Sequence, residues 1–254
     1  MVTLMGPTID IVIPVLNEEK ALPQCVMILS EFLRENLPDN PWKVIIADNG
    51  STDNTRTVSE MLAQRYLGIS YVYIPQRGRG RALRMTWLES NADMVGYMDV
   101  DLSTNLGSLP KLVQSIEEGY DIAIGSRLVQ GSRTSRSFKR ELISRIYNKI
   151  VKGMFFVPFR DAQCGFKIMS RHASKALIPL VKNNNWFFDT ELLIIASKLG
   201  FRINEVPVEW VEDPDSRVKV FKTAWEDVRG LLRLRFGGIP SLPPSLASMW
   251  DDRL

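Results

Sequence analysis

The sequence predicts an α/β fold with a mainly parallel central sheet that helices cover on both faces. Near-continuous apolar runs rich in β-branched residues alternate with segments of helical length, which is typical of strands buried on both sides. Polar residues follow the first four runs, at the edge where such sheets bind ligands. The 254-residue chain is 45% hydrophobic and 24% charged, an ordinary globular composition.

Five apolar runs are predicted to be strands. They are IDIVIPVL from Ile9, WKVIIAD from Trp42, ISYVYIP from Ile69, MVGYMDVD from Met94 and YDIAIGS from Tyr120. The segment STDNTRTVSEMLAQRY, between the second and third runs, opens with helix-capping residues and is predicted to be helical.

The second half of the chain has a different texture. Residues 130–159 are basic and apolar together, and the segment DAQCGFKIMSR follows them. We then expect a helix in FFDTELLIIASKLG, a strand in FRINEVPVEW and a last helix from about Phe221 to Arg235. One domain over residues 1–237 is predicted, followed by a Pro- and Ser-containing tail over residues 238–254, in which Trp250 could dock.

Composition excludes several classes of protein. The formal net charge of +3 does not indicate a nucleic-acid binder. Cys25 and Cys164 match no metal or redox spacing, which indicates a reducing compartment. Asp10 and Pro14 interrupt the apolar start, so no signal peptide is predicted, and no run approaches the roughly 20 residues that cross a bilayer. We expect a chain that is soluble or lies on a membrane surface.

Asp99 and Asp101 stand at the end of the fourth predicted strand. Residues two apart on a strand point to one side, so both carboxylates could face one Mg²⁺ or Mn²⁺ ion. The alternative is a solvated loop with two acids. Three other polar strand ends nearby, at Asn17-Glu18, Asp48 and residues 77–81, favour the metal site.

A dinucleotide-binding enzyme is the competing interpretation of an alternating α/β start. That fold needs glycines in its first strand-to-helix turn, and the turn here, PVLNEEKAL, has none. The Gly-X-Gly pattern at Gly78 and Gly80 follows the third strand instead. A nicotinamide-dependent enzyme is therefore disfavoured.

Several motifs together carry a family resemblance. IVIPVLNEE, IIADNGSTDNT, RGRGRAL and MDVDLST occur in this order, and DAQCGFKIMSR, WFFDTELLIIASKLGF and VPVEW follow. The first set resembles the family-two inverting glycosyltransferases of the GT-A fold. The second set resembles the polyprenyl-phosphate sugar transferases, which include dolichyl-phosphate glucosyl- and mannosyltransferases. The resemblance covers about residues 8–236 and implies that residues 1–237 form a GT-A catalytic domain.

The resemblance implies a nucleotide-sugar site at the strand ends. Its nucleotide-binding residues would be Pro14, Asn17, Glu18, Asp48, Arg79, Arg81 and Val100. Asp99 and Asp101 would hold Mg²⁺ or Mn²⁺ on the diphosphate, with Gly78 and Gly80 allowing backbone approach to the ligand. Asn17 and Glu18 could also cap and open the first helix.

The resemblance also implies a lipid monophosphate as acceptor. This acceptor is already ionised, because its second pKa lies near 6, so the enzyme needs cations to place it and no base to activate it. Arg127 and Arg140 are predicted to contact the phosphate, and a basic solvated face is the alternative. The remaining residues predicted to bind the acceptor or sugar are Lys139, Gln163, Lys167, Asp189 and Glu191. For the two acids we expect positioning and not proton removal, and His172 is given no chemistry.

Residues 137–159 are predicted to form an amphipathic helical segment on a membrane surface. Leu142, Ile143, Ile146, Ile150 and Met154 follow helical spacing, and Arg145, Lys149 and Lys152 lie on another side. A basic amphipathic helix that runs into aromatic residues fits the headgroup layer of a membrane. A helix whose apolar stripe faces the core is the alternative.

The predicted function is that of a metal-dependent inverting glycosyltransferase on the cytoplasmic face of a membrane. It would move a hexose from a nucleotide sugar to a polyprenyl or dolichyl phosphate, with UDP-glucose favoured and GDP-mannose as the alternative donor. Two other functions stay open, a transferase acting on a glycan hydroxyl and a non-catalytic protein that binds nucleotide sugar or lipid. A transmembrane partner subunit could supply an anchor, and no nucleic-acid partner is expected.

Overall fold

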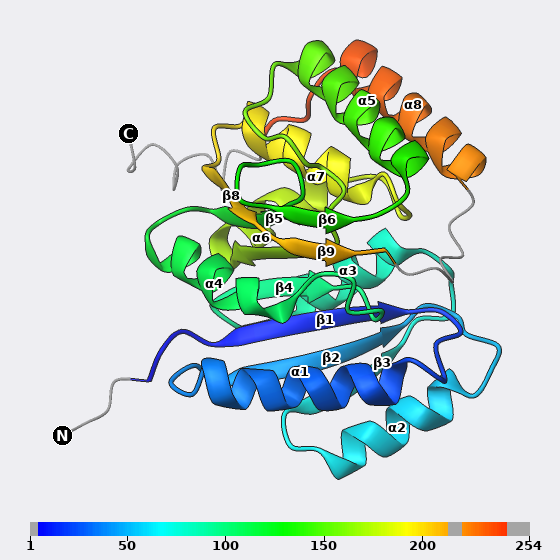
Figure 1. Cartoon of the computed structure of the whole chain (residues 1–254), viewed down its shortest axis with the longest axis vertical. Coiled ribbons are helices and arrows are strands. Elements are labelled where there is room, and N and C mark those ends of the chain that lie inside the picture. Colours follow the sequence, from blue (N-terminus) through cyan, green and yellow to red (C-terminus); the bar gives the residue numbers. More distant parts are fainter. Residues whose placement is uncertain (1–4, 213–219, 243–254) are drawn as a thin grey trace.

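A seven-stranded sheet crosses the protein in the computed structural model, which describes residues 5–212 and 220–242 (Figure 1). The strand order is β3-β2-β1-β4-β7-β5-β8, and all neighbouring strands are parallel except at the two edges of β7. The strands are β1 (Ile9–Val15), β2 (Trp42–Asp48), β3 (Ile69–Tyr73), β4 (Met94–Met98), β5 (Ile122–Ser126), β7 (Phe166–Ser170) and β8 (Ile203–Pro207). The predicted α/β fold with a mainly parallel sheet is confirmed.

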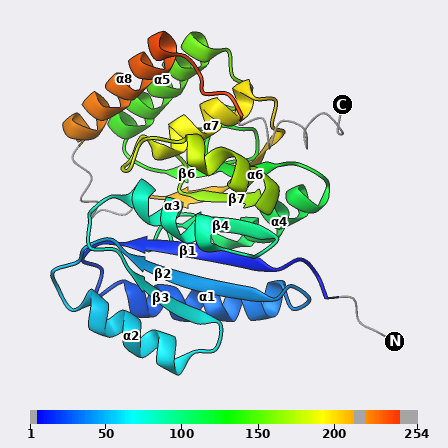
Figure 2. The same ribbon diagram turned by 180° about the vertical axis from the view of Figure 1, so that it is seen from behind.

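Helices cover both faces of the sheet because its strands are apolar on both sides. In β1, for example, Ile9, Ile11 and Ile13 join one core cluster and Val12 joins the other. The helices are α1 (Leu22–Asn36), α2 (Thr55–Arg65), α3 (Arg79–Glu89), α4 (Leu109–Glu117), α6 (Arg171–Leu177) and α7 (Phe188–Lys198). Helices α1 and α4 contribute to the first cluster, and α3, α6 and α7 to the second (Figures 1 and 2).

Strand β7 was not predicted, and it is inserted antiparallel between β4 and β5. Gly96 of β4 faces Ile168 of β7, and a Cβ on Gly96 would lie 2.8 Å from the Lys167 carbonyl oxygen. This close approach needs a glycine. The insertion brings the preceding segment, residues 161–165, beside the end of β4.

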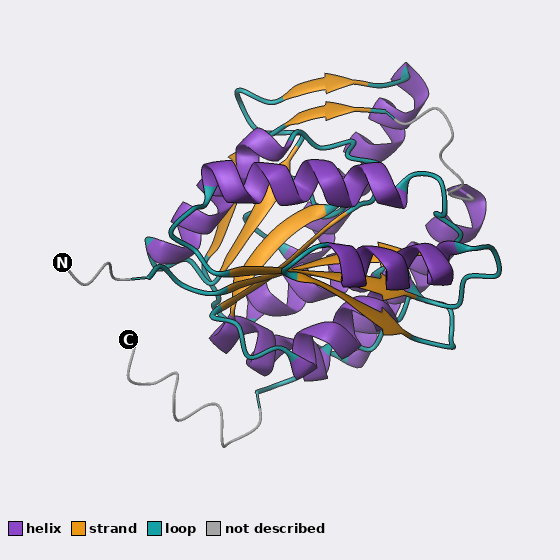
Figure 3. Cartoon of the chain, turned by 90° about the horizontal axis from the view of Figure 1, so that it is seen from below, coloured by secondary structure: helices purple, strands orange, loops and turns teal. Residues whose placement is uncertain are grey.

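The strand predicted in FRINEVPVEW is in fact two strands. Strand β8 ends at Pro207, and β9 (Glu209–Val211) leaves the sheet to pair in parallel with β6 (Arg133–Ser135). Pro207 has no N–H with which to continue a ladder, so the chain changes partner there. The two-stranded ribbon lies outside the central sheet (Figure 3).

Two long helices lie side by side on the outer side of α7 (Figures 1 and 2). They are α5 (Phe138–Phe155) and α8 (Val220–Gly237). Val151 and Phe155 of α5 and Leu231 and Leu234 of α8 join the core. No helix within the described residues is both long and apolar enough to span a bilayer. The predicted tail is described only to residue 242, so Trp250 lies outside the described residues.

Candidate active site

The loops after β1 and β2 are joined by hydrogen bonds that side chains make to backbone. The Asn17 side chain accepts a bond from the Thr52 N–H at 2.7 Å, and the Glu18 N–H donates to the Thr55 hydroxyl at 2.8 Å. Asn17 has φ 59°, in the left-handed region that asparagine tolerates. Because α1 begins only at Leu22, the alternative in which Asn17 caps that helix is wrong.

Asp48 is fully buried at the end of β2. Its Oδ1 accepts from the Ser51 N–H at 2.9 Å, and its Oδ2 accepts from the Tyr71 hydroxyl at 3.3 Å. Burial and the neighbouring Asp48 raise the pKa of Tyr71, so its hydroxyl stays a donor. Asp48 therefore holds the loop after β2 in shape, and its contact with a nucleotide base stays a prediction. Pro14, one strand away, is half-buried beside Ala47.

Asp99 and Asp101 lie in a turn and not on a strand, because β4 ends at Met98. The Leu102 N–H reaches the Asp99 carbonyl oxygen at 3.5 Å, and Leu102 has φ 53°. Asp101 is exposed, and its Oδ1 accepts from the Ser103 N–H at 2.9 Å. Strand alternation is therefore not what orients the two acids. Val100, between them, is half-buried and packs on the core cluster that includes α1.

The Asp99 carboxylate lies directly against Gly165. A Cβ added to Gly165 would come within 1.7 Å of Asp99 Oδ2, so only glycine leaves this carboxylate its place. The Asp99 side chain is 40% exposed. Gly165 belongs to the DAQCG segment that β7 holds in position.

The two acids fit a Mg²⁺ or Mn²⁺ site in which the substrate supplies the remaining ligands. Both offer carboxylate oxygens at an accessible turn, and these are the ligands such ions prefer while they keep positions for water and phosphate. Within residues 5–212 and 220–242, no group of three or more His, Cys, Asp or Glu side chains is placed to hold a metal ion. Asp99 and Asp101 would therefore hold the ion together with diphosphate oxygens.

Arg79 connects Asp99 of this turn to the interior of the protein. Its guanidinium donates to Asp99 at 3.0 Å and to Asp189 at 2.5 Å. It lies between the rings of Tyr97, at 4.6 Å, and Trp186, at 5.0 Å, and its side chain is only 10% exposed. Two acids and two aromatic rings thus contact Arg79, and its predicted role in nucleotide binding stays a prediction.

Asp189 is held by two cations and a hydroxyl. Besides Arg79, Lys167 lies 2.9 Å from its Oδ1, and the Tyr97 hydroxyl donates to the same oxygen at 2.5 Å. Burial alone would raise the pKa of Asp189, but Lys167 and Arg79 outweigh it and hold the pKa below its usual value. A carboxylate so stabilised in its charged form is a poor base.

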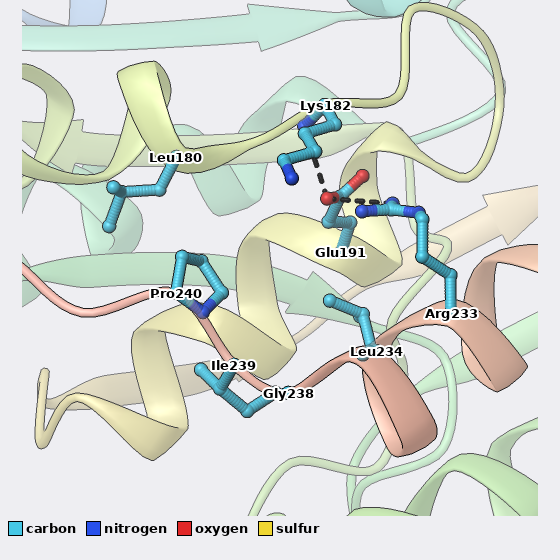
Figure 4. A pocket seen from close by; sticks show the side chains of 9 residues that line it. Leu180, Lys182, Glu191, Arg233, Leu234, Gly238, Ile239 and Pro240 are labelled. Atoms are coloured by element: carbon cyan, nitrogen blue, oxygen red, sulfur yellow. Dashed lines mark hydrogen bonds and ion pairs between the residues drawn. The ribbon is translucent and has the colours of Figure 1, made fainter.

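Glu191 is fully buried on the same helix and organises the preceding loop. Its two oxygens accept from the N–H groups of Lys182 and Asn183, at 3.0 and 2.8 Å. Arg233 of α8 pairs with it at 2.8 Å. Figure 4 shows Glu191, Lys182 and Arg233 at a cavity of about 200 Å³ that Leu180 and Pro240 also line. Glu191 therefore ties the loop over residues 182–187 to α8.

The predicted phosphate cations are paired with acids. Arg127, only 10% exposed, bonds Asp161 through two nitrogens at 2.7 and 2.8 Å. Arg140 is 40% exposed and pairs with Glu212 at 2.6 Å. Arg127 is thus part of a buried ion pair, and its predicted contact with the acceptor phosphate stays a prediction, whereas Arg140 and the exposed Lys139 are accessible.

Two further predicted residues contact other parts of the chain. Gln163 donates to Asp227 of α8 at 3.1 Å. Arg81 donates its backbone N–H to the Asn184 carbonyl oxygen at 2.9 Å and its side chain to the Arg77 carbonyl oxygen at 2.9 Å.

The glycines of RGRGRAL allow close packing of the chain, and their predicted backbone approach to a ligand stays a prediction. A Cβ on Gly78 would lie 2.5 Å from the Asn184 carbonyl oxygen, and one on Gly80 would lie 2.5 Å from Phe188 Cβ. The start of α3 is therefore pressed against residues 184–188.

Sequence reasoning missed Tyr97, Gly165 and Trp186 as site residues. Trp186 directly precedes the FFDTELL motif, and Gly165 lies inside DAQCGFK, so both stood in segments that the resemblance had marked. Nothing in the sequence signalled Tyr97, which reads as one more apolar residue of β4.

A mainly parallel sheet with an Asp-X-Asp turn at the carboxyl end of β4 is the arrangement of glycosyltransferases with the GT-A fold. The model of the family described as "Glycosyl transferase family 2" matches residues 10–178, and the chain belongs to that family. The predicted family and fold are both confirmed.

Curated relatives cover most of this chain. Glycosyltransferase AglD of Haloferax volcanii is 36% identical over 222 residues, which are 87% of this chain and 36% of AglD. Dolichyl-phosphate beta-glucosyltransferase ALG5A of Trichomonas vaginalis is 30% identical, over 84% of this chain and 68% of the relative. The human dolichyl-phosphate beta-glucosyltransferase is also 30% identical, over 89% of this chain and 74% of the relative. The chain thus spans about a third of the length of AglD.

Solved structures share the fold. Glucosyl-3-phosphoglycerate synthase from Mycobacterium tuberculosis, in complex with UDP, superposes with a TM-score of 0.68 at 25% identity, covering 94% of this chain and 83% of that chain. The same enzyme with Mn²⁺, UDP and glucosyl-3-phosphoglycerate gives a TM-score of 0.66 at 22% identity, covering 94% of this chain and 83% of that chain.

Gly165→Ala is expected to abolish the binding of Mn²⁺ together with a nucleoside diphosphate, because the new methyl group would displace Asp99. Calorimetric titration in the presence of Mn²⁺ measures this. Gly153→Ala is the matched control, since a Cβ there meets nothing within 4 Å. Wild-type affinity in the Gly165 variant would show that the position of Asp99 is not needed.

Asp227 is expected to make the protein less stable as pH rises. Burial raises its pKa from 3.8 to about 7. Its contribution to the free energy of unfolding is therefore complete below pH 3.8 and is lost as pH rises through about 7. In urea unfolding between pH 5 and 8, the free energy of unfolding of Asp227→Asn should rise relative to that of the wild type as pH increases. A difference that does not change with pH would contradict this.

Proposed function

We propose that the protein transfers a hexose from a nucleotide sugar to a polyprenyl or dolichyl phosphate. One observation carries the proposal. Both acids of the FFDTELL motif are committed to cations, Asp189 to Arg79 and Lys167, and Glu191 to Arg233. An acceptor hydroxyl needs a base, whereas a phosphate monoester with a second pKa near 6 is already an anion at neutral pH.

UDP-glucose is the favoured donor and GDP-mannose the alternative. Two relatives that match most of this chain are named dolichyl-phosphate beta-glucosyltransferases, which supports a glucosyl donor and a lipid phosphate acceptor. A solved structure of the same fold holds UDP.

The chemistry needs one bond to form and one to break. An oxygen of the lipid phosphate attacks C1 of the hexose, the bond from C1 to the diphosphate oxygen breaks, and the configuration at C1 inverts. A Mg²⁺ or Mn²⁺ ion held by Asp99 and Asp101 would supply positive charge to the leaving diphosphate. Arg79 and Gly165 fix the Asp99 carboxylate for this task.

The acceptor phosphate is proposed to bind at the start of α5. Arg140 and Lys139 are accessible there, and a phosphate could replace Glu212 as the partner of Arg140. Arg127 lies deeper, and its guanidinium contacts the ring of Trp210 at 5.4 Å, which helps to hold β9 in place. Its role is therefore to position the acceptor site.

An exposed apolar face on α5 and α8 supports attachment to a membrane surface. Its residues are Phe138, Leu142, Ile143, Ile146, Ile150 and Phe156 on and beside α5, and Trp225, Val228, Leu232 and Phe236 on α8. Their exposed fractions run from 46% to 84%. A water-exposed apolar area of this kind is typical of an interaction site.

The opposite side of α5 faces the interior with Ser144, Asn148, Val151 and Phe155. Four of the five apolar residues predicted for the membrane side therefore point outward, and the core-facing alternative does not describe them. Arg145, Lys149 and Lys152 are exposed on the same helix, which favours an anionic, cytoplasmic leaflet.

Label from UDP-glucose or GDP-mannose should pass to polyprenyl phosphate in the presence of Mn²⁺. Asp99→Asn with Asp101→Asn should lower this transfer by about 10³-fold, since the leaving group loses its charge stabilisation. Extraction of labelled lipid measures the reaction, and polyprenol without phosphate is the control acceptor. Absence of lipid product with both donors would overturn the proposal and favour a mere binding protein, and undiminished transfer by the double variant would show that Asp99 and Asp101 do not hold a metal ion needed for the reaction.

The protein should float with vesicles that contain anionic lipid. Ile146→Asp with Val228→Asp is expected to weaken the binding at least about tenfold, because two apolar contacts with the bilayer are lost. Leu67→Asp is the matched control, as Leu67 is 96% exposed in the turn between α2 and β3. Vesicle binding that the double variant leaves unchanged, or no binding at all, would contradict the membrane assignment.

A further inference from the structure

Trp186 is an exposed aromatic residue that the proposed chemistry does not yet use. It is 40% exposed, whereas the next two residues, Phe187 and Phe188, are fully buried. Apolar side chains of this size are usually buried, so a tryptophan held open to water beside a site points to a ligand.

The loop that carries Trp186 is held firmly. Glu191 accepts from the N–H groups of Lys182 and Asn183, and the Asn183 side chain accepts from the Asn185 N–H at 2.7 Å. Asn184 accepts from Arg84 at 3.0 Å. Because the backbone on both sides of Trp186 is fixed, the indole is held in a defined place before any ligand arrives.

That place is next to the predicted metal ligand. The indole covers the Arg79 guanidinium at 5.0 Å, and the same guanidinium bonds Asp99 at 3.0 Å. If the diphosphate is held at Asp99 and the nucleoside at the loops after β1 and β2, the hexose is the end of the donor that is left for this indole. The nucleotide base, at the other end of the donor, would lie further away.

We propose that the exposed part of the Trp186 indole packs against the hexose of the donor and thereby selects a nucleotide sugar over the free nucleoside diphosphate. This inference rests on the proposed function. Hexoses present C–H groups on one face, and a rigid aromatic ring offers matching apolar area at little cost in side-chain entropy. Trp186 is thus a specificity-determining residue.

A purely structural role for Trp186 is the competing explanation. Arg79 keeps a second ring, Tyr97, at 4.6 Å and two carboxylate partners without Trp186. Loss of the indole should therefore leave Arg79 and Asp99 in place, and with them the binding of the diphosphate.

The test compares UDP-glucose with UDP, each in the presence of Mn²⁺, for the wild type, Trp186→Leu and Trp186→Phe. Trp186→Leu should weaken UDP-glucose binding by about three- to tenfold and change UDP binding by less than about twofold. Trp186→Phe should restore most of the lost affinity. Equal weakening of both ligands, or no change in either, would overturn the inference. If GDP-mannose proves to be the donor, the pair is GDP-mannose and GDP.

Failure of this inference can be told apart from failure of the proposed function. A wild type that binds neither UDP-glucose nor GDP-mannose would refute the function itself. A Trp186→Leu variant with normal donor affinity but a raised KM for polyprenyl phosphate would refute the inference alone, because the indole would then serve the acceptor.

Discussion

The rest of the site depends on the ion pairs that the buried Asp189 carboxylate makes with Arg79 and Lys167. Charges can be buried only when they are paired and hydrogen-bonded, and removal of one partner typically costs about 3–5 kcal/mol. The three residues come from α7, α3 and β7, so this one cluster fixes three elements relative to each other. Through Arg79 it also reaches Asp99, the predicted metal ligand.

The same cluster constrains the chemistry. Two cations stabilise the charged form of this carboxylate, so its affinity for a proton is low and it is a poor general base. A nucleophile that arrives already ionised avoids this difficulty. Helix α8 extends the arrangement outward, since its inner side pairs with Glu191 through Arg233 while its outer side exposes Trp225 and Phe236. The exposed apolar face of α5 and α8 and the site are therefore parts of one packed unit.

Local patterns made much of this predictable from sequence. The apolar runs of β1 to β5 and the stripe on α5 follow simple periodicities, and motif order located the Asp-X-Asp turn. Strand β7 escaped prediction because Lys167 is its second residue, and a buried lysine is tolerable only through tertiary partners, Asp189 among them. The pairing of Arg127 with Asp161 was equally hidden, since the two lie 34 residues apart and no local rule joins them.

The dependence of the transfer rate on pH, measured with two acceptors of different acidity, tests the central claim most directly. A polyprenyl phosphate and the more acidic polyprenyl thiophosphate would be compared under saturating donor. If the acceptor supplies its own negative charge, the rate rises with the second ionisation of each acceptor, and the midpoint moves to lower pH for the thiophosphate. An identical midpoint for both would show that a group of the protein removes the proton, and would contradict the account.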